Sequence, residues 1–183
     1  MPRDSCRWAS WVAQPTPGSY HENGNRPEGA MTPEETALRA ELAELAAQPR
    51  GRALLQLSLR GLQDESRGLT AGCWNRRGVS GCLFQHAYWQ GVGEGVFQPG
   101  GLANERIERF VGGADYRLVV RAIAAFDRLG RRRFQERTRG PLGVPRRRLM
   151  EPQWRTAVEG VLVDALADTH ARPDQPTRAA SRG

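Results

Sequence analysis

The stretch YRLVVRAIAAFDRLGRRRF, residues 116–134, decides the fold, because it carries the strongest amphipathic signal in the chain. Its apolar residues recur every three or four positions, which is the spacing of one face of an α-helix. They are Leu118, Val119, Ala122, Ile123, Phe126 and Leu129. Asp115 stands directly before the stretch and is expected to be the N-cap of this helix. The stretch therefore predicts a long helix with one side in the core.

Helical patterns and start signals recur along the rest of the chain. The clearest start is Thr32-Pro33-Glu34-Glu35, where Thr32 is expected to be the N-cap, Pro33 takes the first helical position and Glu35 completes a capping box. The other predicted helices are 33–47, 52–66, a helix with Ser80 as N-cap that covers CLFQHAYWQ, the segment ERIERFV capped by Asn104, and a last helix from Pro152. The expected fold class is all-α, a single small domain of five or six helices.

Both ends of the chain are expected to lie outside this domain. Residues 1–30 are rich in Pro, Gly and Asn without periodicity, and they are either a disordered leader or sequence upstream of a true start at Met31 rather than Met1. The helical domain is expected over 31–172, and 173–183 is expected to be a disordered tail. A hydrophobic fraction of 39% agrees with a chain that is only partly core.

Positive charge is concentrated in one part of the chain. All 27 basic residues are arginine, and the net charge is +7. Nine arginines and one acid, Glu136, lie between Arg128 and Arg148, so this segment alone carries +8. A codon bias explains the absence of lysine, but it does not gather charge into one segment. Such a cluster is typical of a surface that binds nucleic acid or an acidic protein.

The arginines of the long helix are predicted to share a face opposite the apolar stripe. Arg117, Arg121, Arg128 and Arg132 are spaced 4, 7 and 4 residues apart. The full candidate surface adds Arg131, Arg133, Arg146, Arg147 and Arg148. One interpretation is a surface that contacts phosphates, and the alternative is an ordinary solvated helix face.

Cys73, Cys82 and His86 form the second candidate site. With Ser80 as N-cap, Cys82 would lie in the first turn of its helix, where the macrodipole favours a thiolate, and His86 would share its face. The three side chains could begin a zinc or iron site, or a reactive or redox thiol. The spacing is not that of a paired zinc knuckle. The alternative is that Cys82 is a small core residue and His86 a half-buried helix residue.

The main hypothesis is a small, soluble, cytoplasmic binding or regulatory protein that uses the arginine surface. The alternative is a metal- or thiol-based protein centred on Cys73, Cys82 and His86. A third hypothesis is an enzyme with a pocket between the CLFQHAYWQ helix and the helix of Glu105 and Glu108. No apolar run is long enough for a transmembrane segment, and the N-terminus does not resemble a signal peptide.

Overall fold

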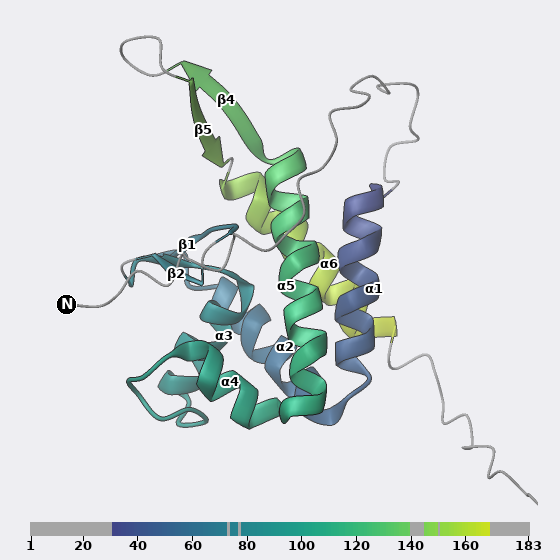
Figure 1. Ribbon diagram of the computed structural model, residues 1–183, viewed down its shortest axis with the longest axis vertical. Helices are drawn as coiled ribbons and strands as arrows, with labels where there is room; N and C mark the ends of the chain where they lie inside the picture. The colour runs from purple at the N-terminus through teal and green to yellow at the C-terminus, as the bar shows by residue number, and fades with distance from the viewer. Residues whose placement is uncertain (1–30, 73, 77, 140–144, 150, 169–183) are drawn as a thin grey trace, which may run out of the picture.

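The computed structural model describes residues 31–72, 74–76, 78–139, 145–149 and 151–168 (Figure 1). The protein is all-α, as the sequence predicts, with short strands between some of the helices. The helices are α1 (Pro33–Ala46), α2 (Pro49–Leu62), α3 (Leu83–Gly93), α4 (Ala103–Val111), α5 (Gly113–Arg133) and α6 (Glu151–Asp168). The strands are β1 (Gly68–Leu69), β2 (Asn75–Arg76), β3 (Ser80–Gly81), β4 (Gln135–Arg139) and β5 (Pro145–Leu149).

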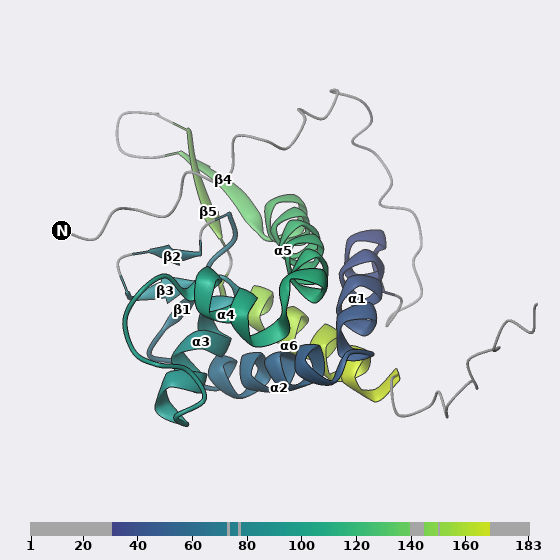
Figure 2. The same ribbon diagram turned by 60° about the horizontal axis from the view of Figure 1, so that its bottom comes forward.

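Helix α5 is the long amphipathic helix, and its apolar stripe lies against the core. Val119, Ala122, Phe126 and Leu129 are buried, while Leu118 and Ile123 are partly buried against the same cluster. Figures 1 and 2 show α1 beside α5, and Figure 1 shows α6 passing behind both helices. Helix α6 contributes the buried residues Trp154, Val158, Val161, Leu162 and Ala165, and Leu166 is partly buried against the same cluster. Burial of these apolar faces is the main force that holds α1, α5 and α6 together.

The predicted capping box begins α1. The Glu35 amide donates a hydrogen bond to Thr32 Oγ1 over 3.1 Å, and the Thr32 amide donates one to Glu35 Oε2 over 2.7 Å. These two bonds satisfy amides that the start of a helix leaves unpaired. The prediction of this helix start is confirmed.

Other helix boundaries differ from the prediction. Helix α2 begins at Pro49 rather than at residue 52, because proline is well tolerated in the first turn of a helix. It ends at Leu62 instead of continuing to residue 66. Helix α3 has Cys82 as its N-cap, and α5 has Gly112, whose φ of 92° suits glycine. Asp115 lies in the first turn of α5, where its negative charge interacts favourably with the positive end of the helix dipole.

Helices α2 and α3 pack at very close range. A Cβ atom placed on Gly61 would lie 2.4 Å from the His86 carbonyl oxygen and 2.8 Å from its carbonyl carbon. Only glycine allows this approach, because any side chain would collide with backbone atoms that cannot move independently of α3. The contact fixes His86 against the end of α2.

The strands were not predicted from the sequence. Strand β3 lies between β1 and β2, parallel to β1 and antiparallel to β2. Strands β4 and β5 pair antiparallel. The segment GPLGVP was expected only as a break, but its last residue, Pro145, is the first residue of β5. Figures 1 and 2 show the β4–β5 pair extending away from the helices beyond the end of α5. We call this pair the arginine ribbon, because positions 137, 139, 146, 147 and 148 are all arginine.

Candidate functional site

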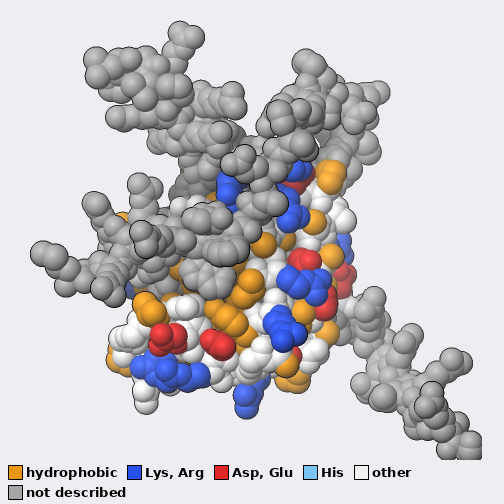
Figure 3. Space-filling view, viewed as in Figure 1, with side chains coloured by type: hydrophobic (Ala, Val, Ile, Leu, Met, Phe, Trp, Pro, Cys, Tyr) orange, Lys and Arg blue, Asp and Glu red, His pale blue; other side chains and the backbone are white. Residues whose placement is uncertain are grey.

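Two of the four arginines of the predicted α5 face, Arg121 and Arg132, pair with acids of α1, and so does the flanking Arg133. Arg121 lies 2.8 Å from Glu41 and 3.0 Å from Glu44. Arg132 lies 3.1 Å from Glu34, and Arg133 lies 3.5 Å from Glu35. Figure 3 shows acidic and basic side chains next to one another on this side of the molecule. Much of the positive charge of this face is therefore balanced within the protein.

The remaining candidate arginines divide into two groups. Arg131 contacts Asp127 on its own helix at 3.7 Å, whereas Arg117 and Arg128 are exposed and have no ion-pair partner among the described residues. Arg146, Arg147 and Arg148 lie on β5, whose backbone is described. Their side chains lie outside the described part of the structure. The excess of positive charge over negative charge is thus greatest along the arginine ribbon.

The register of the ribbon places like charges opposite one another. The Cα partner of Arg137 is Arg147, and the Cα partner of Glu136 is Arg148. The two strands together hold five arginines and one acid. Like charges at directly opposed positions destabilise an antiparallel pair, and opposite charges stabilise it. Sequence reasoning included the β5 arginines in the surface but missed Arg137 and Arg139, because it expected no strand here.

Cys82 is buried and does not have the character of an activated thiol. Cys82 is 1% exposed and belongs to the hydrophobic core. Burial raises the pKa of the Cys82 thiol to about 12, despite nearby backbone amides that favour the thiolate. The expected lowering by the helix start is therefore outweighed by desolvation, which disfavours the charged form.

His86 is fully buried, with both ring nitrogens against backbone carbonyls. Nδ1 lies 3.0 Å from the Gly61 oxygen, and Nε2 lies 3.2 Å from the Gly68 oxygen. The two carbonyls belong to the end of α2 and to β1, so the ring lies between the two ends of the loop that connects α2 to β1. One interpretation of the sequence placed the His86 ring on the same face as the Cys82 sulfur, and the alternative made His86 a half-buried helix residue. In the structure each ring nitrogen has a backbone carbonyl as its neighbour.

A zinc or iron site stays a prediction. Among the described residues, no group of three His, Cys, Asp or Glu side chains is placed to hold a metal ion. Cys73 lies outside the described residues, so a site that includes it is not tested. Of the proposed ligands, His86 already has a neighbour at each nitrogen and Cys82 is held as a buried thiol.

Two residues that sequence reasoning missed hold the loops around His86. Arg155 of α6 donates hydrogen bonds to the Leu62 carbonyl and, over 2.6 Å, to the Arg67 carbonyl. Asp127 of α5 accepts a hydrogen bond of 2.7 Å from the Gly72 amide. Each of these hydrogen bonds joins residues more than fifty positions apart in the sequence, so no local pattern predicts them.

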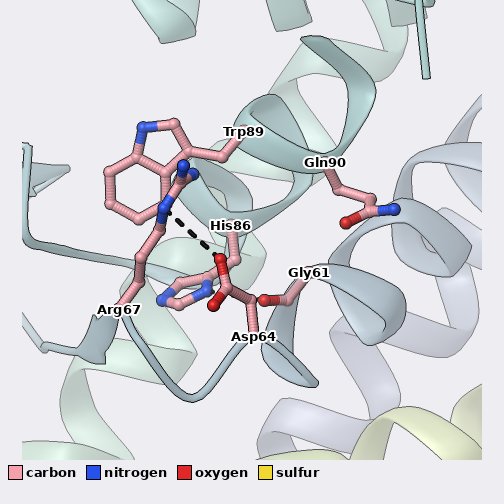
Figure 4. Close-up of a pocket in the computed structure, with 6 residues that line it drawn as sticks. All are labelled: Gly61, Asp64, Arg67, His86, Trp89 and Gln90. Atoms are coloured by element: carbon pink, nitrogen blue, oxygen red, sulfur yellow. Dashed lines mark hydrogen bonds and ion pairs between the residues drawn. The ribbon is translucent and has the colours of Figure 1, made fainter. Parts of the chain in front are cut away.

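A cleft of about 190 Å³ has His86 in its lining (Figure 4). The Arg67 guanidinium stacks 4.6 Å from the centre of the Trp89 ring, and its Nε lies 3.5 Å from Asp64. The lining residues are Gly61, Asp64, Arg67, His86, Trp89 and Gln90. The cleft therefore lies between α2 and α3, and its lining does not include Glu105 or Glu108, around which a pocket was expected.

The protonation of His86 gives a pH-dependent contribution to stability. Burial lowers the pKa of His86, and the positive charges of Arg155 and Arg67 lower it further, while the two carbonyls partly oppose these effects. Below about pH 6.5 the imidazole of His86 becomes protonated in the unfolded chain, whereas the folded protein disfavours its protonation. The free energy of unfolding therefore falls as the pH is lowered. We expect the free energy of unfolding, measured in urea, to fall between pH 7.5 and 5.5 in the wild type.

A His86→Gln variant provides the comparison for this effect. It lacks the imidazole but retains a polar side chain, and the His86 contribution to the pH dependence should disappear. If the two carbonyls instead hold an imidazolium, the wild type would gain stability relative to the variant as the pH falls. That result would contradict the lowered pKa.

Comparison with known protein families, curated proteins and solved structures gave no match to this chain. None of the described helices is both long enough and apolar enough to cross a bilayer.

Proposed function

We propose that the protein binds nucleic acid through the arginine ribbon and the exposed arginines near the C-terminal end of α5. The observation that carries this proposal is the pairing of Arg137 with Arg147 in a two-stranded ladder that holds a single acid. Such a ladder is unfavourable by itself, because residues of like charge at directly opposed positions destabilise an antiparallel pair. A polyanion along the ribbon would remove that repulsion and release its own counterions.

The contrast with α5 supports this assignment. Where arginines of α5 approach α1, acids from that helix balance them at 2.8–3.5 Å. Within the ribbon the Cα register places one acid opposite an arginine, Glu136 opposite Arg148. Surface ion pairs contribute only about 0–1 kcal/mol each, so a polyanion could also displace Glu34 from Arg132 at the base of the ribbon.

The proposal is tested by neutralising three ribbon residues in the full chain. We expect the R146Q/R147Q/R148Q variant to bind a short DNA duplex at least about tenfold more weakly than the wild type at low salt. The slope of log affinity against log salt should fall by about 1 for each lost phosphate contact. Fluorescence anisotropy at salt concentrations between about 50 and 200 mM measures both quantities.

Two comparisons make this experiment specific. The R50Q/R106Q/R109Q variant removes the same charge from exposed or partly exposed positions on α2 and α4, and should bind nearly as well as the wild type. The E34Q/E35Q variant should bind a few-fold more tightly, because it frees Arg132 and Arg133, while glutamine still completes the capping box. Equal losses in the two arginine variants would show that net charge alone governs binding. Tighter binding to polyglutamate than to nucleic acid would favour an acidic protein partner instead.

A further inference from the structure

The two faces of the arginine ribbon differ in charge. In an antiparallel pair, directly opposed residues share a face, and successive residues alternate between faces. Positions 135, 137, 139, 145, 147 and 149 therefore share one face, and positions 136, 138, 146 and 148 share the other. The first face holds Arg137, Arg139 and Arg147 without an acid, whereas the second holds Arg146 and Arg148 with Glu136. We call these the 137 face and the 148 face.

The composition of the ribbon favours a double-stranded ligand. The segment from Gln135 to Leu149 contains no aromatic residue, and Phe134 at its base is buried. Proteins that grip single strands usually stack bases on exposed aromatic rings, so the ribbon lacks that means of binding. Guanidinium groups in a row instead suit the regularly spaced phosphates of a duplex.

A two-stranded ribbon suits the grooves of B-form DNA better than those of double-stranded RNA. A two-stranded β-ribbon fits the major groove of B-form DNA, which is about 12 Å wide. The major groove of A-form RNA is too deep and narrow for side chains to enter. The ribbon extends away from the helices beyond the end of α5 (Figure 1).

We propose that the ribbon enters the major groove of double-helical DNA with its 137 face toward the groove. This inference rests on the proposed nucleic-acid binding and specifies its ligand and orientation. In this arrangement the opposed Arg137 and Arg147 positions lie between the two phosphate backbones. The 148 face, where Glu136 opposes Arg148, is directed away from the DNA.

The test compares two variants with the same change in charge. The R137Q/R147Q variant alters the 137 face, and the R146Q/R148Q variant alters the 148 face. We expect the first to weaken binding to duplex DNA at least about tenfold and to lower the salt slope by about 2, and the second to change affinity less than about threefold. An R137K/R147K variant, which keeps the charge, should retain most of the salt slope. Circular dichroism confirms that each variant keeps its helices.

The outcomes separate this inference from the proposed function. Equal losses in the two glutamine variants, or a larger loss in R146Q/R148Q, would overturn the assignment of the 137 face. Equal wild-type affinity for double-stranded RNA or single-stranded DNA of the same length would overturn groove entry, while general nucleic-acid binding would stand. No binding of the wild type to any of these nucleic acids at low salt would overturn both proposals.

Discussion

Cys82 is expected to react with iodoacetamide at least about 1,000-fold more slowly in the folded protein than in the unfolded chain at neutral pH. Only the thiolate reacts, and each unit of pKa changes its amount about tenfold. Burial raises the pKa of the thiol from 9.0 to about 12, and a residue that is 1% exposed also excludes the reagent. A C6S/C73S background isolates this thiol, and mass spectrometry after timed quenching gives the two rates.

This measurement decides between the hypotheses for the cysteine region. A slow native rate that rises to the unfolded rate in urea would agree with a core cysteine. A native rate faster than that of the unfolded chain would contradict the raised pKa and restore the hypothesis of an activated thiol. Metal content of the unaltered protein, purified without oxygen, tests the zinc or iron hypothesis separately, because that hypothesis also needs Cys73.

Replacement of Trp154 by alanine is expected to lower the free energy of unfolding by about 3–5 kcal/mol. The indole is fully buried, with its centre 4.6 Å from that of Phe126 and 5.4 Å from that of Phe134. A Cβ atom placed on Gly130 would lie 3.1 Å from the ring, so α5 packs closely against the indole here. Urea unfolding followed by circular dichroism measures the loss.

A Trp154→Phe variant separates packing from polarity at the same position. The indole Nε1 is buried without a hydrogen-bond partner in the described structure, and leaving such a group unpaired costs about 1–3 kcal/mol. Phenylalanine keeps an aromatic ring but removes this donor. We therefore expect a loss well under half of that in Trp154→Ala. Equal losses of unfolding free energy in the two variants would contradict the separate contributions of ring packing and of the unpaired Nε1.

Local patterns in the sequence were sufficient for most of the helices. The capping box at Thr32 and the apolar stripes of α5 and α6 depend on residues within a few positions of one another, so they can be recognised before the fold is known. Boundaries were less certain, since Pro49 can either end a helix or begin one. Strands β4 and β5 were missed because their charged residues do not alternate with apolar ones, and glycine and proline separate the two strands.

The candidate sites depended far more on tertiary structure. The sequence placed Arg121 and Arg132 on one helix face, but it contained no sign that acids 77 to 98 residues away would pair with them. It also placed Cys82 and His86 one turn apart, yet burial by distant segments decided the state of the thiol and the partners of the ring. Asp127 and Arg155 had no local signature at all.

By itself, the sequence determined that this protein is helical, where its strongest helices lie and where its positive charge gathers, because these properties follow from neighbours along the chain. Tertiary structure alone decided which charges are balanced, that the Cys82 thiol is buried and which arginines oppose one another across the ribbon. The physical reason is that desolvation and ion pairing depend on the distances between elements, and a sequence period specifies a face without specifying what covers it.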